Sequence, residues 1–558
     1  MPCTSVCGAY FHLPVLFCKK RIAFANFAVT KTETMKSVLK LIVAALTVAS
    51  CSSFFDSRGE VVDVEGSVPH DMIVLGDKLE DPYSVTNMTK AFESLYPTKA
   101  GRTYLEPTDY YVRFLPEGEA ELESLMASGM VLLDHPVDYE ILRDGDYYHD
   151  PSLDEDRITW QYGLVPKGQD FPADIRYEVL DECYLPDHDA GTKADGVDWE
   201  QVERLSYELT GNAGMLRDAT KGTSSGKPSG RISIIDPAYD DEPFGVSGVT
   251  VLAVSFVKFC TTTTDDEGYY SMKKTFNSDV RYRLVFKNEK GFAIGFNKIL
   301  VPASTSTLGK HGPDGVSMVV SGKSDGKLFQ RCAVNNAAYD WWVSCAAKTP
   351  HVKTPPNNLR LWIFQSIGSS SAIMMQQGCM VDDSAIGDIL GDMAWLVKMF
   401  LPDITIGLKG CRDDYASIYA LAVHECAHAS HFTAVGQKWW DVLSDFVLKS
   451  YVTSGMKLYG TGMEKNHGYC EIAEMWAYAV QAMMFHERYV GSDLVFGTSY
   501  WFFPQILLYL EERGLTRYKV FQAMTSDVTD RDLFQAKLLS LYPEYKSIIK
   551  QAFERYDY

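Results

Sequence analysis

The segment His424-Glu-Cys-Ala-His428 most constrains the fold of this chain, because its two histidines can act together only if they lie on one helix. An α-helix has about 3.6 residues per turn, so residues four apart project from one face and two imidazoles can reach one ion. Glu425, beside the first histidine, is placed to act on a metal-bound water as general base. The segment therefore predicts a helix that carries a hydrolytic zinc site.

The flanking residues predict that this helix is long and buried. Asp413 and Asp414 precede a stretch without Pro or Gly, and acidic side chains favour a helix start, where backbone N–H groups are free. Apolar residues then recur at helical spacing through the motif to Val435, and Gly436 is a natural stop. We therefore expect the motif on a helix of about five turns over residues 415–435.

His431 lies on the same helix face as His424 but too far along the axis to share its metal ion. At a rise of about 1.5 Å per residue the two histidines stand roughly 10 Å apart, whereas zinc binds its ligands at about 2 Å. Metzincins, which share the motif, break the helix with a Gly after the second histidine, but Ala429 and Ser430 follow here. We therefore expect His431 near the site but outside the ligand set.

A second apolar helix, predicted over 469–484, offers carboxylates as the third ligand. It carries Glu471 and Glu474 about one turn apart on an otherwise apolar stripe. Burying a charge costs free energy unless the charge is paired or bound to a metal. The residues by themselves leave open which glutamate binds the metal, or whether the two are a solvated or salt-bridged pair.

The two helices together resemble those of the gluzincin group of zinc metallopeptidases. Members of that group have H-E-x-x-H on one helix and E-x-x-A on the next, and Glu474-Met-Trp-Ala-Tyr-Ala is similar to the second run. The resemblance implies that His424, His428 and Glu474 bind Zn²⁺, and that Glu471 is an outer partner orienting a ligand histidine. The reverse assignment of Glu471 and Glu474 stays open, because both face the same way.

The resemblance also implies a donor to the negative charge that develops on the substrate carbonyl. One branch of the group has a Tyr-Gly pair at the offset where His467 and its following glycine stand here, seven residues before Glu474. That tyrosine stabilises the oxyanion, so we expect His467 to replace it as the donor. Tyr469 is the alternative donor, and His467 is otherwise a loop histidine or a partner of Glu464 or Glu471.

Two apolar segments upstream of the zinc motif predict a small sheet. Residues 359–365 and 403–407 have the composition of short strands and flank helical segments. In gluzincin-like domains the edge strand of such a sheet runs beside the cleft, where an extended peptide can add as another strand. We expect residues 403–407 to be that edge strand, or else a plain core strand.

Residues 35–51 have the composition of a secretory signal, with Met35 as the expected start of the chain. A basic segment from Met35 leads into apolar residues 41–50 and then Cys51, and this apolar stretch is too short to span a bilayer. Val48-Ala-Ser-Cys resembles a lipobox, which implies that Cys51 is lipidated and begins the mature chain. Residues 1–51 are therefore expected to be an upstream segment and a lipoprotein signal peptide; a membrane anchor is the alternative.

A lipid anchor at Cys51 would place a soluble enzyme in a bacterial cell envelope, periplasmic or on the cell surface, with the outer membrane as the expected membrane. A net charge of -20 argues against partners such as nucleic acid or anionic surfaces. The cysteines after Cys51 include no C-x-x-C pair, so the sequence does not predict their pairing.

The remainder divides into the units of a multidomain α+β protein. Residues 52–220 mix apparent strands with helices and predict an N-terminal α+β domain, with strands at 110–115 and 130–133. A Gly/Ser-rich linker follows at 221–229. No motif assigns this N-terminal domain a role.

Short alternating strands separated by turn residues predict a β-sandwich over 230–303. The run G-V-T-V from Gly248, followed by T-D-D-E-G-Y-Y from Thr264, resembles carboxypeptidase regulatory-like domains, which have a prealbumin-like fold and serve as accessory modules. Residues 328–558 then form the zinc domain, mainly helical with a small sheet.

These features predict an extracytoplasmic, lipid-anchored zinc metallopeptidase whose substrate is a protein or peptide. Glu425 is the expected general base, and His467 the expected donor to the oxyanion. Two alternatives stay open. One is a non-catalytic binding or scaffold lipoprotein, and the other is a zinc hydrolase acting on a non-peptide bond of a glycoconjugate.

Overall fold

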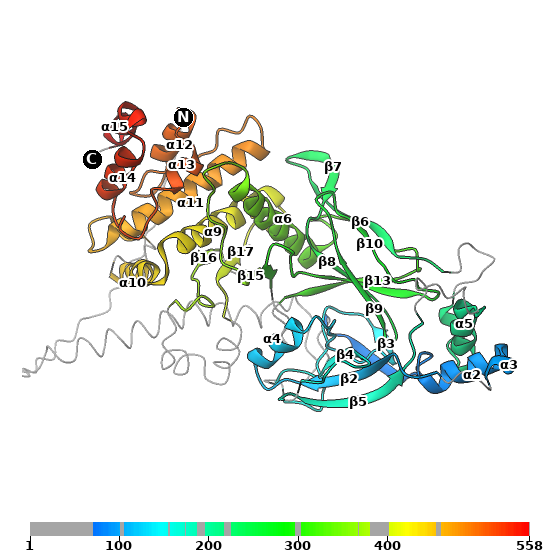
Figure 1. The fold of residues 1–558 in the computed structure, drawn as a ribbon. Coiled ribbons are helices and arrows are strands. Elements are labelled where there is room, and N and C mark those ends of the chain that lie inside the picture. Colours follow the sequence, from blue (N-terminus) through cyan, green and yellow to red (C-terminus); the bar gives the residue numbers. More distant parts are fainter. Residues whose placement is uncertain are drawn as a thin grey trace, which may run out of the picture.

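The computed structural model arranges the chain as three adjoining units (Figure 1). It describes residues 71–100, 105–154, 157–172, 174–186, 196–216, 225–295, 303–365, 368–379, 401–453 and 459–556. The predicted signal peptide with Met35 and Cys51 lies outside these residues, as do residues 221–224 of the predicted linker. Helices together with several sheets confirm the predicted multidomain α+β fold class. Among the helices of the described ranges, none is long and apolar enough to cross a lipid bilayer.

The N-terminal unit, residues 71–216, is built on an antiparallel sheet with β2 at its centre. Because side chains alternate along a strand, Val112 and Phe114 of β2 pack with Leu125 of α4, while Tyr111 faces the sandwich unit. A separate antiparallel pair joins β1 to β3. The elements are β1 (Val74–Lys78), α2 (Val85–Leu95), α3 (Pro97–Ala100), β2 (Asp109–Leu115), α4 (Glu119–Ala127), β3 (Tyr139–Arg143), β4 (Gln161–Pro166), β5 (Arg176–Cys183), α5 (Trp199–Leu209) and the 3-10 turn η1 (Ala213–Met215).

The strand predicted at 130–133 is wrong. Only Leu133 pairs there, through a single bridge in which it exchanges both backbone hydrogen bonds with Tyr162 of β4. The chain then turns at Asp134, whose carboxylate accepts the backbone N–H of Tyr148, and Pro136 has no N–H to continue a ladder. The run has the apolar composition of a strand, but the turn at Asp134 limits its backbone pairing to a single residue.

The sandwich unit, residues 229–320, has two sheets that share one core. One has the order β13-β11-β8-β9, and the other places β6 between β10 and β14, with β7 also paired to β6. The unit continues past the predicted end at 303. β13 pairs with β11 in one sheet, and β14 pairs with β6 in the other. Its strands are β6 (Ser229–Asp236), β7 (Asp240–Gly245), β8 (Thr250–Ser255), β9 (Lys258–Thr263), β10 (Tyr269–Ser271), β11 (Val280–Val285), β13 (Thr305–His311) and β14 (Met318–Val320).

Both faces of β8 are buried. Val251 and Ala253 point into the core shared by the two sheets, while Leu252 and Val254 pack against Tyr83 and other residues of the N-terminal unit. A strand covered on both sides reads as a continuous apolar run, which is how β8 appears in the sequence. The N-terminal unit is therefore the outer cover of the sandwich.

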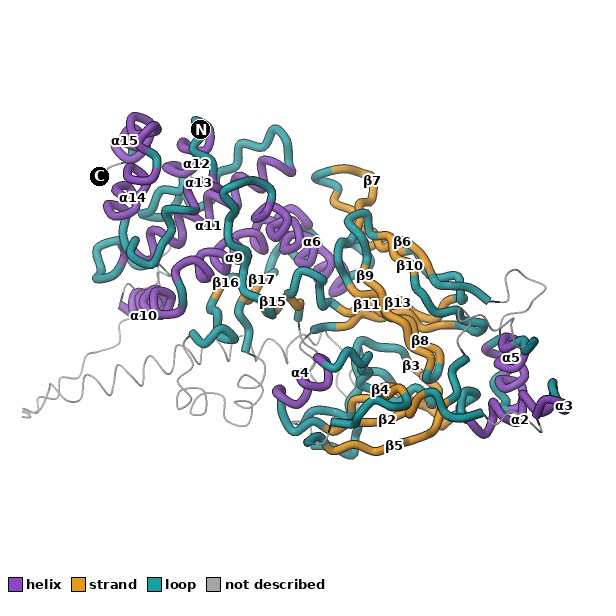
Figure 2. The backbone as a smooth tube through the Cα atoms, in the orientation of Figure 1, coloured by secondary structure: helices purple, strands orange, loops and turns teal. Residues whose placement is uncertain are grey.

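The helical unit, residues 326–556, stacks its helices on one side of a small sheet (Figure 2). In that sheet β12 and β15 are parallel, β17 is parallel to β15, and β16 closes the edge as an antiparallel strand. The elements are α6 (Gly326–Ala346), β15 (Leu359–Phe364), β16 (Ser371–Ala372), β17 (Ile404–Gly407), α9 (Tyr415–Val435), α10 (Gln437–Thr453), α11 (His467–Arg488), α12 (Gln505–Glu512), α13 (Arg517–Phe521), α14 (Arg531–Leu541), the 3-10 turn η3 (Pro543–Tyr545) and α15 (Lys546–Arg555).

Two strands of this sheet differ from expectation. The segment predicted as the edge strand, 403–407, forms β17 inside the sheet, flanked by β15 and β16, so the edge assignment is wrong. Ile404 and Ile406 are fully buried, as suits an interior strand. The strand β12 (Phe292–Ile294) belongs by sequence to the sandwich region but pairs with β15. The chain thus ties two units together through one sheet.

A buried ion pair fixes the N-terminal unit to the sandwich. The Lys258 ammonium on β9 lies 3.1 Å from a carboxylate oxygen of Glu203 on α5, and neither side chain is more than 3% exposed. Asn277 donates a further hydrogen bond to the same carboxylate. Such a pair is costly to break from one side, because the remaining charge stays in a low-dielectric interior.

Lys258→Met should therefore destabilise the protein by about 3–5 kcal/mol, since it removes the ammonium that balances Glu203. Urea unfolding measures the change. Lys78→Met is the matched control, because Lys78 pairs with Asp138 at 3.2 Å but is largely exposed, and it should cost less than about 1 kcal/mol. Equal effects of the two substitutions would contradict a buried, structural role for Lys258.

Candidate metal centre

The helix that carries the H-E-x-x-H motif forms as the sequence predicts. α9 spans Tyr415–Val435, the Asp414 carboxylate accepts the Ser417 N–H at its start, and Gly436 ends it with φ +82°. Trp341 of α6 donates its indole N–H to the Ser430 hydroxyl, and Trp476 of α11 donates to a backbone carbonyl of α9. These contacts hold the motif between two neighbouring helices.

The helix α11 runs antiparallel to α9 and brings Glu474 close to both His424 and His428. His428 faces Glu474, His424 faces Gln481, and nearer the start of α9 Tyr419 meets Tyr489. α11 begins two residues earlier and ends four residues later than the predicted span of 469–484. The antiparallel arrangement gives each histidine a partner on the opposite helix.

Three donor atoms converge at the centre of this helix pair. The Nε2 atoms of His424 and His428 are 3.1 Å apart, and the Glu474 carboxylate oxygens lie 3.6 Å and 3.4 Å from them. Ligands about 2 Å from a tetrahedral ion stand about 3.3 Å from one another. All three side chains are buried. His424, His428 and Glu474 thus form a buried group that can bind a metal ion.

The electrostatics of the group also suit a cation. Burial alone would raise the pKa of Glu474, but His428 and His424 outweigh it and lower that pKa to about 2. Burial, reinforced by the Glu474 charge and partly opposed by His424, raises the pKa of Glu425 to about 8. One carboxylate oxygen of Glu425 is buried without a hydrogen-bond partner. A cation would stabilise both carboxylates in their charged form.

Glu471 points away from the metal group. Its carboxylate lies 3.6 Å from the guanidinium of Arg531 on α14. The Nδ1 atom of His424 instead meets the side-chain oxygen of Gln481 at 3.2 Å. Glu474 is therefore the carboxylate of the metal group, and the side chain that contacts His424 Nδ1 is Gln481 rather than Glu471.

His431 lies one turn beyond His428 and is enclosed by tryptophans. Its ring centroid is 4.6 Å from that of Trp439 and 5.7 Å from that of Trp440, and neither ring nitrogen has a hydrogen-bond partner. Burial, together with His428, lowers the pKa of His431 to about 3. His431 is thus a neutral, fully buried ring outside the metal group, as expected from the helix rise.

The predicted donor His467 is the first residue of α11. Its Nδ1 lies 2.8 Å from the Glu464 carbonyl oxygen, and its ring packs against Trp501. Tyr478, one turn after Glu474, contacts the metal group directly: its ring centroid is 4.3 Å from that of His424. The sequence contained this signal, because residues four apart share a helix face.

A second tyrosine joins Tyr478 from the loop before α11. The rings of Tyr459 and Tyr478 both pack against Phe502. Burial, and next the charge of Glu474, raise the pKa of both tyrosines, so both remain neutral donors. Sequence reasoning missed Tyr459 because a loop residue carries no helical spacing that would place it.

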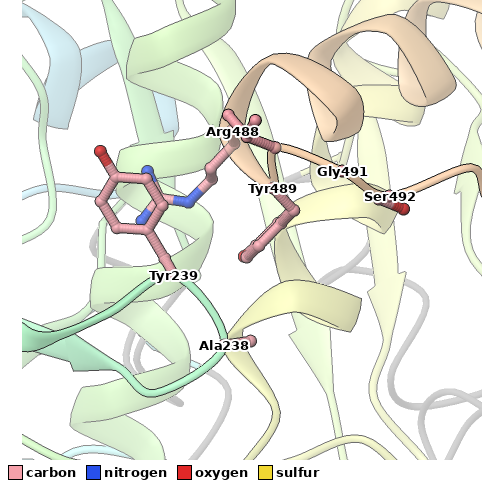
Figure 3. Close-up of a pocket in the computed structure, with 7 residues that line it drawn as sticks. Ala238, Tyr239, Arg488, Tyr489, Gly491 and Ser492 are labelled. Carbon is pink, nitrogen blue, oxygen red and sulfur yellow. The ribbon is translucent and has the colours of Figure 1, made fainter.

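Arg488 connects the start of α9 and the end of α11 to the sandwich unit (Figure 3). Its guanidinium lies 3.4 Å from an Asp236 carboxylate oxygen on β6 and covers the rings of Tyr239 and Tyr415 at 4.3 Å and 4.9 Å. Arg488 and Tyr239 also border a hollow of about 460 Å³, which no residue of the metal group lines. This end of the helix pair is a structural joint, distinct from the metal centre.

Comparisons with protein-family models, with curated proteins and with solved structures found no match to this chain. Its function must therefore be inferred from the chemistry of the metal group.

Glu474→Gln should weaken metal binding far more than Glu471→Gln, because only Glu474 contributes an atom to the metal group. We expect a loss beyond the roughly 10- to 100-fold that follows removal of an outer partner. Competition with a chromophoric chelator measures the affinity. Glu471→Gln is the matched control on the same helix and should keep its metal; equal losses in the two variants would contradict the assignment.

His431→Phe should keep metal binding and make the protein more tolerant of acid. The folded-state pKa of about 3 lies below the ordinary value, so the unfolded chain takes up a proton near pH 6 that the folded chain does not, and the wild type loses stability as the pH falls. Between about pH 8 and about pH 5 the free energy of unfolding of the variant should fall by about 2 kcal/mol less. Urea unfolding at both pH values, with metal analysis of each sample, checks this. A variant that loses its metal, or one with the pH dependence of the wild type, would refute the description of His431.

Proposed function

We propose that this chain is a zinc metallopeptidase of the gluzincin type, with His424, His428 and Glu474 as the zinc ligands. The proposal is carried by one observation: three buried donor atoms from two helices stand at separations that suit a tetrahedral ion. Two imidazoles and one carboxylate form a donor set used by catalytic zinc, which keeps a fourth position for water or substrate. Glu425, next to the first ligand, has no hydrogen-bond partner for one of its oxygens.

The chemistry divides between the ion and the chain. Zinc, when bound, lowers the pKa of water and polarises a carbonyl. Glu425 accepts the proton of the attacking water and passes it to the leaving amine. Because burial favours its protonated form, Glu425 can hold this proton until the amine departs.

Tyr478 and Tyr459 are the donors that we assign to the developing oxyanion. Tyr478 packs on His424, and Tyr459 and Tyr478 both pack against Phe502. A preorganised phenol donor in a water-poor site stabilises negative charge on oxygen more than it does in water. His467, the donor expected from the sequence, instead contacts the Glu464 carbonyl in the loop before α11 and the ring of Trp501.

A peptide substrate is favoured by the strand at the edge of the small sheet. Trp440 donates its indole N–H to the Ala372 carbonyl of β16, and the Trp440 ring is 5.9 Å from that of His428. An extended peptide laid along this strand would have its bonds near the metal group. We infer further that the enzyme is exported and lipid-anchored at Cys51, from the signal-like segment that precedes it.

Glu425→Gln should abolish peptide hydrolysis while zinc stays bound, because Glu425 lies outside the ligand group. The loss expected for a missing general base is about 10²- to 10⁴-fold in kcat. Cleavage of a fluorogenic peptide library and zinc content by elemental analysis measure the two properties together. Glu471→Gln serves as control and should keep both. Unchanged proteolysis in Glu425→Gln would overturn the proposal, and cleavage of glycoconjugates alone would replace the peptidase with a hydrolase of another bond.

A further inference from the structure

A continuous set of aromatic rings leads away from the metal group. We call Tyr459, Tyr478, Tyr500 and Phe502 the aromatic wall. Ring centroids are 5.9 Å apart between Tyr478 and Tyr500, 5.7 Å between Tyr478 and Phe502, and 4.8 Å between Tyr459 and Tyr500. Since Tyr478 itself packs on His424 at 4.3 Å, the wall begins at a metal-binding side chain.

Glycines in the two loops that flank α11 press the backbone against aromatic rings here. A Cβ on Gly497 would lie 2.7 Å from the ring of Tyr478, and a Cβ on Gly462 would lie 2.7 Å from the ring of Trp501. Both glycines also have positive φ, +76° and +81°, which side chains rarely adopt. The contacts fix the position of Tyr478 and leave its ring little room to move.

The wall combines buried and exposed rings. Phe502 is fully buried, whereas Tyr500 is 42% exposed, and Met463 in the loop before α11 is 89% exposed. The acidic side chain of this loop, Glu464, is bound by the Thr461 hydroxyl and by backbone N–H groups of the loop. The wall thus presents the ring of Tyr500 at the surface, and the loop that carries Tyr459 presents the thioether of Met463.

We propose that the aromatic wall is a specificity subsite, which binds a bulky apolar or aromatic side chain of a peptide beside the bond that is cleaved. This inference rests on the proposed peptidase function. An aromatic side chain placed on Tyr478 and Tyr500 loses water-exposed apolar area and gains ring contacts of the kind that the wall already makes within itself. Ring faces do not replace the hydration shell that a charged side chain would lose there. The subsite thus selects for aromatic and large aliphatic residues.

The first test uses zinc-binding probes and needs no catalysis. Propanohydroxamic acid and 3-phenylpropanohydroxamic acid carry the same zinc-binding group and differ by one phenyl ring. We expect the phenyl compound to bind the zinc-loaded protein on the order of tenfold more tightly. Tyr500→Ala should reduce this ratio several-fold. Tyr269→Ala is the matched control, since Tyr269 is 54% exposed on β10 of the sandwich, and it should leave the ratio unchanged. A ratio that is the same in Tyr500→Ala and in the wild type overturns the subsite.

The second test separates this inference from the proposed function. Peptides with Phe, Leu, Ala or Asp on either side of the bond are compared by kcat/KM in the wild type, Tyr500→Ala and Tyr269→Ala. Preference for Phe and Leu that Tyr500→Ala diminishes supports the subsite. Cleavage without preference, or a preference for glycosylated peptides whatever the neighbouring side chain, overturns it. No cleavage of any peptide, with the difference between the two hydroxamic acids intact, counts against the peptidase function and in favour of the apolar subsite.

Discussion

The close antiparallel contact between α9 and α11 is the constraint on which the site depends. Three ionisable side chains meet there largely shielded from water, and burying them costs free energy that their mutual attraction offsets only in part. The helices can approach because small residues line the contact: Ala427 on α9 and Ala473 and Ala477 on α11 are fully buried. A metal ion would offset the remaining free-energy cost of burial, because its positive charge balances the negative charges of Glu474 and Glu425.

The remaining units hold this helix pair in place. Trp341 and Trp476 pack against each other and hydrogen-bond to α9. At the far end Arg488 joins α11 to β6 of the sandwich and to the rings at the start of α9. Because β12 leaves the sandwich to pair with β15, the sandwich is part of the framework of the helical unit. The buried pair of Lys258 and Glu203 extends the framework to the N-terminal unit.

Local patterns were sufficient where spacing within one element decided the outcome. The bounds of α9 follow from Asp414 and Gly436, and the position of His431 outside the metal group follows from helix rise. Local patterns failed where the neighbours of an element decided it. The segment at 403–407 has the composition of an edge strand and of an interior strand alike, and only its pairing with β15 and β16 distinguishes the two. The side chains of the run at 130–133 are apolar because they pack against the core of the N-terminal unit, but its backbone pairs with a strand at a single residue.

The sequence by itself determined that two histidines share a helix face, that Glu425 stands beside them, and that a second helix carries two carboxylates. Those facts depend only on the regular geometry of a helix. Only the tertiary structure decided between the carboxylates, because Glu471 and Glu474 have the same local spacing and differ in what faces them: Arg531 for one and the two histidines for the other. Tyr459 likewise reaches the centre from a loop, and the position of a loop residue is set by what it packs on and has no period that the sequence could display.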